Sequence, residues 1–382
     1  MADHLPGAPA HRIAVLLSSM GRGGAERVAA TLCNAWARQG REPWLVPTFL
    51  GARDVAYPLH DAVRLQFLGD LPEVAAGSGI APLRKLRALR RWLSEVRPDV
   101  VVSFLPNVNV LAATATRGLG LPLIVCERAD PAAGVDLELG LHAARLVAYP
   151  FASRVCVQTF QAARRLRRRL LACGEFAVIP NPLPDTLTAF PARSHRPARG
   201  GTVIGIGRLS PEKGFDSLLR AFHHGFADAP EWRLEIWGDG PLRSNLESQV
   251  SALGLGGRAR ICGAASDPWP VMAAAQIFAL TSAYEGFPNA MLEAMALGLP
   301  TVSFDCNSGP RDLTDSGRVG VLVPPGDELA MARELRALAD DSVRRDLLGH
   351  TGASFVRSAF SESAVLKRWD ALFSEIITPF KG

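Results

Sequence analysis

The stretch IFALTSAYEGFPNAMLEAMALGLPTVSF, residues 277–304, decides the fold class because it contains a complete strand–helix–strand unit. Its first run, 277–282, is short and continuously apolar, which predicts a strand buried on both faces of a parallel sheet. Pro288 suits the first position of a helix that Gly298 ends. The run at 300–304 then predicts the next parallel strand.

The same alternation of apolar runs and helical stretches continues along all 382 residues. In the first half the predicted strands are 12–19, 43–50, 63–69, 99–105, 121–127 and 154–159. In the second half they are 202–207, 232–238, 258–263, 277–282, 300–304 and 320–324. Two such series predict an α/β protein with two doubly wound, Rossmann-like parallel-sheet domains.

The boundary between these domains is visible as TAFPARSHRPARGG, residues 188–201, whose proline, arginine and glycine content is typical of a linker. We therefore predict a first domain at 1–187, a second at 202–360 and a terminal helix within 361–382. Doubly wound domains bind ligands outside the carboxyl ends of their strands, so we expect the site in a cleft between the two domains.

Composition excludes several other classes of protein. The chain is 48% hydrophobic and 21% charged, and no apolar run reaches the roughly 18 residues of a membrane span. The first residues, MADHLPGAPAHR, lack the basic region and apolar core of a secretory signal. Six scattered cysteines form no CxxC pair, which favours reduced thiols over disulfides or a zinc site. We expect a cytoplasmic protein.

Charge is distributed unevenly between the two halves. Residues 1–187 contain 22 Lys and Arg against 15 Asp and Glu, a net charge of +7, whereas residues 188–382 contain 20 against 22, a net charge of −2. This asymmetry predicts an anionic partner for the first half. Nucleic acid, an anionic membrane face and a phosphorylated substrate would each satisfy it.

Two glutamates lie close to the start of the helix at 288–297. Glu285 is in the loop that enters it and Glu293 is in its second turn, so both side chains can face one cleft. A carboxylate accepts paired hydrogen bonds from the vicinal hydroxyls of a sugar or ribose. The free N–H groups near Asn289 and Ala290 form an anion site. The alternative is a capped helix with two surface glutamates.

Two cations follow the first strand of the second half, in GRLSPEKGFDSLLRAF, residues 207–222. Arg208 leaves the tip of the strand, and Lys213 lies in a short loop that Gly214 closes before a helix. Cations in this position suit a diphosphate that gains charge as it departs. Solvated loop charges are the alternative, and the strand, turn and glycine context favours the anion site.

Five segments together resemble the family-4 glycosyltransferases with the GT-B fold. EGFPNAMLE (285–293) resembles the Glu-x7-Glu signature of that family, and GRLSPEKGFD (207–216) resembles its Arg/Lys loop. GRGGAERV (21–28) is similar to the amino-terminal glycine loop, VIPNPL (178–183) to the strand before the linker, and SGPRDLTDSGRVGVLVPPGD (308–327) to the nucleotide-side segment. Their joint occurrence in the family's order makes the resemblance specific.

The resemblance implies two domains that face each other across a cleft, with the terminal helix crossing back to the first domain. It implies a retaining transfer of a hexose or N-acetylhexosamine from a nucleotide sugar, most often UDP-linked, in which the leaving phosphate helps to deprotonate the acceptor. No Asp-x-Asp occurs in the chain. This agrees with an enzyme that needs no metal or other cofactor, because its own cations stabilise the leaving diphosphate.

The resemblance also implies roles for individual residues. Arg208 and Lys213 would hold the donor pyrophosphate and act in catalysis with Glu285, which would lie beside the transferred sugar, while Glu293 would bind the ribose hydroxyls. Further donor contacts would come from the backbone around Phe287, Pro288, Asn289 and Ala290, and from Gly23 and Gly24 in the first domain.

The acceptor side departs from the family's commonest pattern. Where many members have a histidine after the fifth strand, this chain has CERADP, residues 126–131. With SFLPNVNVLA at 103–112, this resembles the branch that builds bacterial polysaccharides and protein-linked glycans on polyprenyl-diphosphate acceptors. We expect Glu127 and Arg128 to line the acceptor pocket with Asn107 nearby; a helix cap with a surface arginine is the alternative.

Two arginine-rich stretches also lie in the basic half. Five Lys and Arg occur within Arg84–Arg91 and five Arg within Arg164–Arg169, each in a helical stretch. Both resemble basic amphipathic helices that bind anionic headgroups, which a lipid-linked acceptor would require. We expect peripheral association with the inner face of the plasma membrane; the alternative is a solvated arginine face.

Other readings of the chain fit less well. A nicotinamide dehydrogenase would show GxGxxG and an acid after the second strand, and this chain has GRGG and PTFLG there. A nucleic-acid-binding protein would have aromatic residues between its arginines, and the two arginine-rich stretches of this chain have none. A non-catalytic sugar-nucleotide-binding GT-B protein and a GT-B epimerase stay open as alternatives, although the four charged residues 208, 213, 285 and 293 favour transfer.

Overall fold

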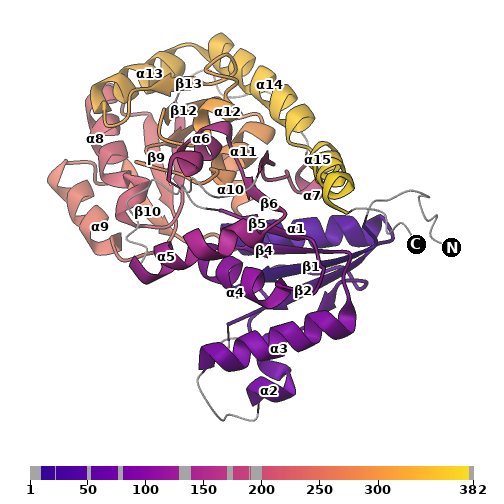
Figure 1. The fold of residues 1–382 in the computed structure, drawn as a ribbon. Helices are drawn as coiled ribbons and strands as arrows, with labels where there is room; N and C mark the ends of the chain where they lie inside the picture. The colour runs from indigo at the N-terminus through magenta and orange to yellow at the C-terminus, as the bar shows by residue number, and fades with distance from the viewer. Residues whose placement is uncertain are drawn as a thin grey trace. The chain divides into compact units, whose positions relative to one another are not determined.

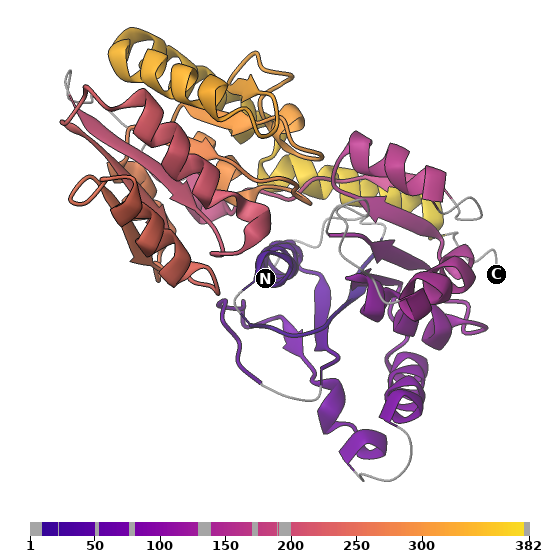
Figure 2. The same ribbon diagram turned by 90° about the vertical axis from the view of Figure 1, so that its left-hand side faces the viewer.

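The computed structural model describes residues 10–21, 23–49, 53–75, 81–128, 139–169, 175–188, 190 and 200–377. The chain forms two compact units, Met1–Pro182 with Glu362–Gly382, and Leu183–Ser361. Each unit is an α/β layer structure in which helices enclose a parallel sheet (Figures 1 and 2). This confirms the predicted fold class of two Rossmann-like domains.

The first unit contains a seven-stranded parallel sheet in the order β3-β2-β1-β4-β5-β6-β7. Its strands are β1 (Arg12–Leu17), β2 (Glu42–Pro47), β3 (Arg64–Leu65), β4 (Val100–Phe104), β5 (Leu123–Cys126), β6 (Arg154–Val157) and β7 (Phe176–Val178). Every residue of the central strands β4 and β5 is buried, as their continuous apolar runs predicted. The strand order reverses direction between β1 and β4, where sheets of this type bind ligands.

Helices cover both faces of this sheet (Figure 1). On one face α1 (Gly24–Arg38) and α15 (Glu362–Ile376) share a core in which the Trp36 and Trp369 rings meet edge to face, with centroids 5.9 Å apart. The opposite face has a second core, to which the sheet contributes Val101 and Val155. Its main helices are α3 (Ala81–Val96), α4 (Pro106–Thr116), α5 (Leu139–Ala148) and α6 (Phe160–Arg169).

The second unit contains a six-stranded parallel sheet in the order β10-β9-β8-β11-β12-β13. Its strands are β8 (Gly201–Ile206), β9 (Trp232–Trp237), β10 (Ala259–Gly263), β11 (Ile277–Leu280), β12 (Thr301–Phe304) and β13 (Val321–Val323). One core holds α8 (Phe215–Gly225), α9 (Arg243–Ala252) and α13 (Glu328–Asp340). The other holds α7 (Asp185–Thr188), α10 (Pro268–Ala274), α11 (Asn289–Ala296), α12 (Pro310–Leu313) and α14 (Ser342–Ala359).

The division between the units falls after Pro182, five residues before the expected end of the first domain at 187. The reason is that Leu183 and Leu187 are fully buried in the core around α11 and α14, and the Leu183 N–H donates to the Phe360 carbonyl oxygen. Most of the expected linker 188–201 lies outside the described residues.

Two smaller observations bear on the predictions. The predicted strand at 63–69 shortens to the two residues of β3, because both are exposed at the edge of the sheet. No helix among the described residues is long and apolar enough to span a bilayer.

Candidate active site

The two predicted charged motifs of the second unit meet at one edge of its sheet. β8 and β11 are adjacent parallel strands, so their carboxyl ends lie side by side. The loop after β8 carries Arg208 and Lys213, and the loop after β11 carries Glu285. Residues 72 positions apart in the chain are therefore brought into contact.

Lys213 and Glu285 form an ion pair at this edge. The Lys213 Nζ lies 2.6 Å from the Glu285 Oε1, which also accepts a hydrogen bond from the Ser282 Oγ at 2.7 Å. Glu285 is buried, with 6% of its surface exposed. Burial, together with the nearby Glu285 carboxylate, raises the pKa of Cys306 to about 12, so this thiol stays protonated at neutral pH.

A tightly fitted turn holds Lys213 in place. Gly214 has a φ of +59°, and a Cβ atom there would lie 2.3 Å from the Thr281 carbonyl oxygen. The Thr281 Oγ1 donates to the Lys213 carbonyl oxygen at 3.1 Å, and the Ala283 N–H donates to the Glu212 carbonyl oxygen at 2.9 Å. Only glycine permits this approach, and the two loops are thereby fixed to each other.

Arg208 is the exposed cation of this edge. Within the described part of the chain, its guanidinium has no hydrogen-bond or ion-pair partner. Its backbone is nevertheless fixed, because a Cβ atom at Gly238 would lie 1.8 Å from the Gly207 carbonyl oxygen and one at Gly240 would lie 2.5 Å from the Leu209 carbonyl oxygen. The turn after β9 therefore fits against this loop, a contact that the sequence analysis missed although Gly-Asp-Gly after a strand is its signal.

The helix α11 supplies the second carboxylate and a set of backbone donors. It begins at Asn289 with Pro288 at its N-cap and no side-chain cap, and the Asn289 N–H donates to the Phe287 carbonyl oxygen at 2.9 Å. Pro288 is positioned by Gly309, where a Cβ atom would lie 2.2 Å from the Pro288 Cδ. Phe287 is buried, and the Ser308 Oγ donates to the Gly286 carbonyl oxygen at 3.0 Å.

Glu293 lies on α11 with only 2% of its surface exposed. Its Oε2 accepts a hydrogen bond from the Trp269 Nε1 at 3.0 Å. Trp269 is on α10, and neither periodicity nor the family motif pointed to it. The indole hydrogen bond fixes the carboxylate in one orientation.

The predicted glycines of the first unit lie at the start of α1. Gly23 is the N-cap of this helix, and its carbonyl oxygen accepts hydrogen bonds from the Tyr57 hydroxyl and the Arg27 N–H, both at 3.1 Å. Gly24 is the first helical residue. Glu26, whose carboxylate a Cβ atom at Gly23 would contact, accepts a hydrogen bond from the Ser19 Oγ. A carboxylate of the chain itself thus lies near this helix N-terminus.

Glu127 lies in the interior of the first unit and not at its surface. It is 3% exposed, its Oε1 is 2.9 Å from a guanidinium nitrogen of Arg145, and it accepts a short hydrogen bond from the Tyr149 hydroxyl. The Tyr149 hydroxyl also accepts from the Asn109 Nδ2 at 3.0 Å. Burial raises the pKa of Glu127, while Arg145 and Tyr149 oppose that shift.

Arg128 and Asn107 are placed differently from Glu127. The Arg128 guanidinium stacks on the Phe104 ring, 3.8 Å from its centroid, and donates to the Asn181 Oδ1 at 2.8 Å. Its Nε and Nη2 are buried and have no hydrogen-bond partner among the described residues. Asn107 is exposed in the first turn of α4, which follows Leu105 at a φ of +78°, a strained conformation of the kind that collects at functional sites.

Comparison with known proteins agrees with this architecture. Residues 23–182 match the model of the glycosyl transferase 4-like domain, and residues 200–341 match that of the glycosyl transferases group 1. An α-1,4-N-acetyl-D-galactosaminyltransferase of Campylobacter jejuni, named for a diNAcBac-PP-undecaprenol glycan, is 27% identical over 96% of this chain and 99% of its own length. An exopolysaccharide phosphotransferase of Streptomyces coelicolor is 29% identical over 76% of this chain, which spans 30% of that protein.

Solved structures share the fold. The crystal structure of Anabaena HepE in complex with UDP has a TM-score of 0.75 with 19% identity, over 95% of this chain and 100% of that one. The two parallel α/β units are those of the GT-B fold. The chain belongs to the family-4 glycosyltransferases of this fold, a family of bacterial glycan biosynthesis.

Proposed function

We propose that this glycosyltransferase transfers a hexose or an N-acetylhexosamine from a UDP-sugar to a polyprenyl-diphosphate-linked glycan, with retention of the anomeric configuration. The observation that carries the proposal is the edge formed by β8 and β11, where the loop that carries Arg208 and Lys213 contacts the loop that carries Glu285. Relatives support it: the Campylobacter protein is named for a lipid-linked acceptor, and the Anabaena protein binds UDP.

In the proposed reaction the donor diphosphate binds between Arg208 and Lys213. Lys213 then shares its charge between Glu285 and the phosphate, since the Lys213 Nζ lies 2.6 Å from the Glu285 Oε1. The bond from the anomeric carbon to the phosphate oxygen breaks, and UDP leaves with the electron pair. The two cations stabilise the charge that accumulates on the departing phosphate.

The acceptor hydroxyl forms the new bond to the anomeric carbon on the face that UDP leaves. Its proton passes to the departing phosphate oxygen, so no base from the protein is needed and the configuration is retained. In this proposal Glu285 orients the sugar, Glu293 binds the ribose, and the N–H groups at the start of α11 contact sugar or phosphate. Gly23 and Gly24 are also proposed to contact the donor.

On the acceptor side we assign direct contact to Arg128 and Asn107. Arg128 donates to the Asn181 Oδ1 from one guanidinium nitrogen, and a guanidinium is suited to paired hydrogen bonds with a diphosphate. We assign Glu127 an indirect role, in which it holds Arg145 and Tyr149 in position, because both side chains already contact its carboxylate. The basic faces of α3 and α6 would hold the protein at the anionic membrane that contains such an acceptor.

The test is a panel of UDP-sugars and GDP-sugars incubated with the purified chain, with and without a prenyl-diphosphate glycan. We expect nucleotide release that depends on the acceptor and on one UDP-sugar, and a product whose anomeric configuration, read by NMR, equals that of the donor. Binding of UDP-sugar without release would make the protein a non-catalytic binder. Interconversion of sugar epimers with UDP still attached would make it an epimerase.

A further inference from the structure

Four helices cover one face of the sheet in the first unit, and they differ in character. α3 and α6 are basic, whereas α4 contains no charged residue and α5 contains only Arg145 and His142 as titratable side chains. All four contribute to the same hydrophobic core, so they lie on the same face. The apolar pair α4 and α5 therefore shares its face with two arginine-rich helices.

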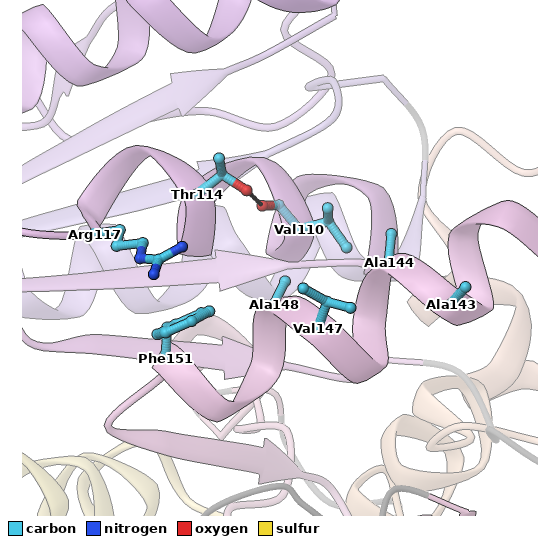
Figure 3. A pocket seen from close by; sticks show the side chains of 8 residues that line it. All are labelled: Val110, Thr114, Arg117, Ala143, Ala144, Val147, Ala148 and Phe151. Atoms are coloured by element: carbon cyan, nitrogen blue, oxygen red, sulfur yellow. Dashed lines mark hydrogen bonds between the residues drawn. The ribbon is translucent and has the colours of Figure 1, made fainter.

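A surface groove of about 430 Å³ lies between α4 and α5 (Figure 3). Its lining is almost entirely apolar, and the lining residues are Val110, Thr114, Arg117, Ala143, Ala144, Val147, Ala148 and Phe151. The Thr114 hydroxyl does not make the groove polar, because it donates to the Val110 carbonyl oxygen within α4 at 2.8 Å. The groove is therefore suited to a hydrocarbon ligand.

The rim of the groove exposes large apolar side chains to solvent. Val147 is 71% exposed and Phe151 is 47% exposed, and Leu146 beside them is 40% exposed. At one end the Arg117 guanidinium stacks on the Phe151 ring, 4.4 Å from its centroid. A cation therefore lies at the end of an apolar channel, as a ligand with an anionic head and an apolar tail requires.

The charges on this face point to the same kind of ligand. The sequence contains no Asp or Glu from 106 to 126 or from 139 to 169. The one acid between these segments that the structure describes, Glu127, is buried against Arg145. In contrast, Arg87 and Arg90 on α3 and Arg164, Arg167 and Arg168 on α6 are exposed. Among the described residues of these helices the exposed carboxylate is Glu95 on α3, which pairs with Arg91. The basic side chains outnumber it, so the described part of the face has a net positive charge that complements an anionic bilayer.

We propose that the α4–α5 groove binds an acyl chain of an anionic phospholipid in the membrane, with Arg117 beside the lipid phosphate and Val147 and Phe151 inserted among the chains. The basic helices α3 and α6 supply long-range attraction, and the groove supplies the apolar contact that makes the attachment specific. This site rests on the membrane attachment of the proposed function, but it concerns attachment and not transfer, so it does not depend on the proposed reaction.

The test measures binding of the full chain to vesicles of phosphatidylglycerol and of phosphatidylcholine. We expect binding to phosphatidylglycerol only, and a Val147→Asn variant should bind about tenfold more weakly, the loss expected when one exposed valine no longer enters an apolar phase. Val343→Asn is the matched control, because Val343 is an equally exposed valine, at 77%, on α14 of the second unit. It should bind like the unmodified chain.

A second measurement locates the acyl chain. Tryptophan placed by Val147→Trp should be quenched by phosphatidylglycerol with brominated chains, whereas tryptophan placed by Val343→Trp should not. Equal vesicle binding of the two asparagine variants, or the absence of quenching at position 147, would overturn the proposal. Dimerisation in solution that Val147→Asn abolishes would overturn it too, because a second copy of the chain would then cover the groove. Transfer to a soluble acceptor analogue should be the same in all four variants.

Discussion

Glu285 and Glu127 are both buried carboxylates that pair with a cation near the end of a parallel strand, yet their surroundings differ. The side chain of Lys213, the partner of Glu285, is 23% exposed, whereas that of Arg145, the partner of Glu127, is 2% exposed. A cation at the surface can turn toward an incoming phosphate, but an enclosed one cannot. The comparison therefore suits the first pair to the proposed reaction and the second to stabilising the first unit.

The largest effect should come from breaking the enclosed pair. Glu127→Gln leaves the Arg145 guanidinium buried without a counter-charge, so we expect the free energy of unfolding to fall by about 3–5 kcal/mol. Denaturant titration measures this. The control is Glu95→Gln in the same unit, where a 60% exposed side chain pairs with Arg91 and the loss should stay below about 1 kcal/mol. Unchanged stability with a raised KM for the acceptor would instead place Glu127 in the acceptor site.

The second effect concerns Arg208, the exposed cation in the same loop as Lys213. Arg208→Ala should lower the turnover number by roughly 10²–10³, the scale for loss of one donor to developing negative charge, with little change in stability. Steady-state rates of UDP release measure it. Arg333→Ala, an exposed arginine on α13, is the matched control and should turn over normally. Turnover near that of the unmodified chain would remove Arg208 from the mechanism.

A smaller effect tests how firmly the turn at Gly214 holds the Lys213–Glu285 pair. Gly214→Ala should lower the free energy of unfolding by about 1–3 kcal/mol, because the new methyl group meets the Thr281 carbonyl oxygen and the turn is strained. Gly254→Ala separates the two causes, since Gly254 has a similar φ of +66° but nothing within 4 Å of its added Cβ. Equal losses in the two variants would show that backbone strain alone matters at Gly214.

The smallest effect concerns the second carboxylate of the site. Trp269→Phe removes the indole hydrogen bond to Glu293, so we expect the KM for UDP-sugar to rise about tenfold while kcat stays the same. Competition by UDP and by its 2′-deoxy analogue checks the cause. The unmodified chain should prefer UDP, and the variant should lose most of that preference; an unaltered preference would contradict a positioning role for Trp269.

Much of the second unit could be predicted from the sequence, because its chemistry follows directly after strand ends. Arg208, Lys213 and Glu285 were proposed as site residues in this way, and the adjacency of β8 and β11 explains why Lys213 and Glu285 meet. Trp269 could not be found, because its contact with Glu293 links α10 to α11 and neither helix shows it in its periodicity.

The first unit was harder to predict, since its important contacts join distant buried residues. Glu127 follows β5 as a site residue would, but Arg145 and Tyr149, about twenty positions later, enclose it. No sequence pattern distinguishes a carboxylate that an arginine of the next helix will bury from one that stays at the surface. The groove between α4 and α5 could not be predicted from the sequence either. Val147 lies in an apolar helix, a pattern that predicts burial, and its side chain is nevertheless 71% exposed.

The return of α15 to the first unit has a consequence for biosynthesis. Arg38 on α1 bonds to Glu362 at the start of α15, a separation of 324 residues. At a synthesis rate of about 5–20 residues per second, the ribosome needs roughly 15–65 s to make the chain between them. During that interval the apolar surface around Trp36 lacks the cover that Trp369 provides in the folded chain. We therefore expect chaperones to bind the nascent amino-terminal half until translation is complete.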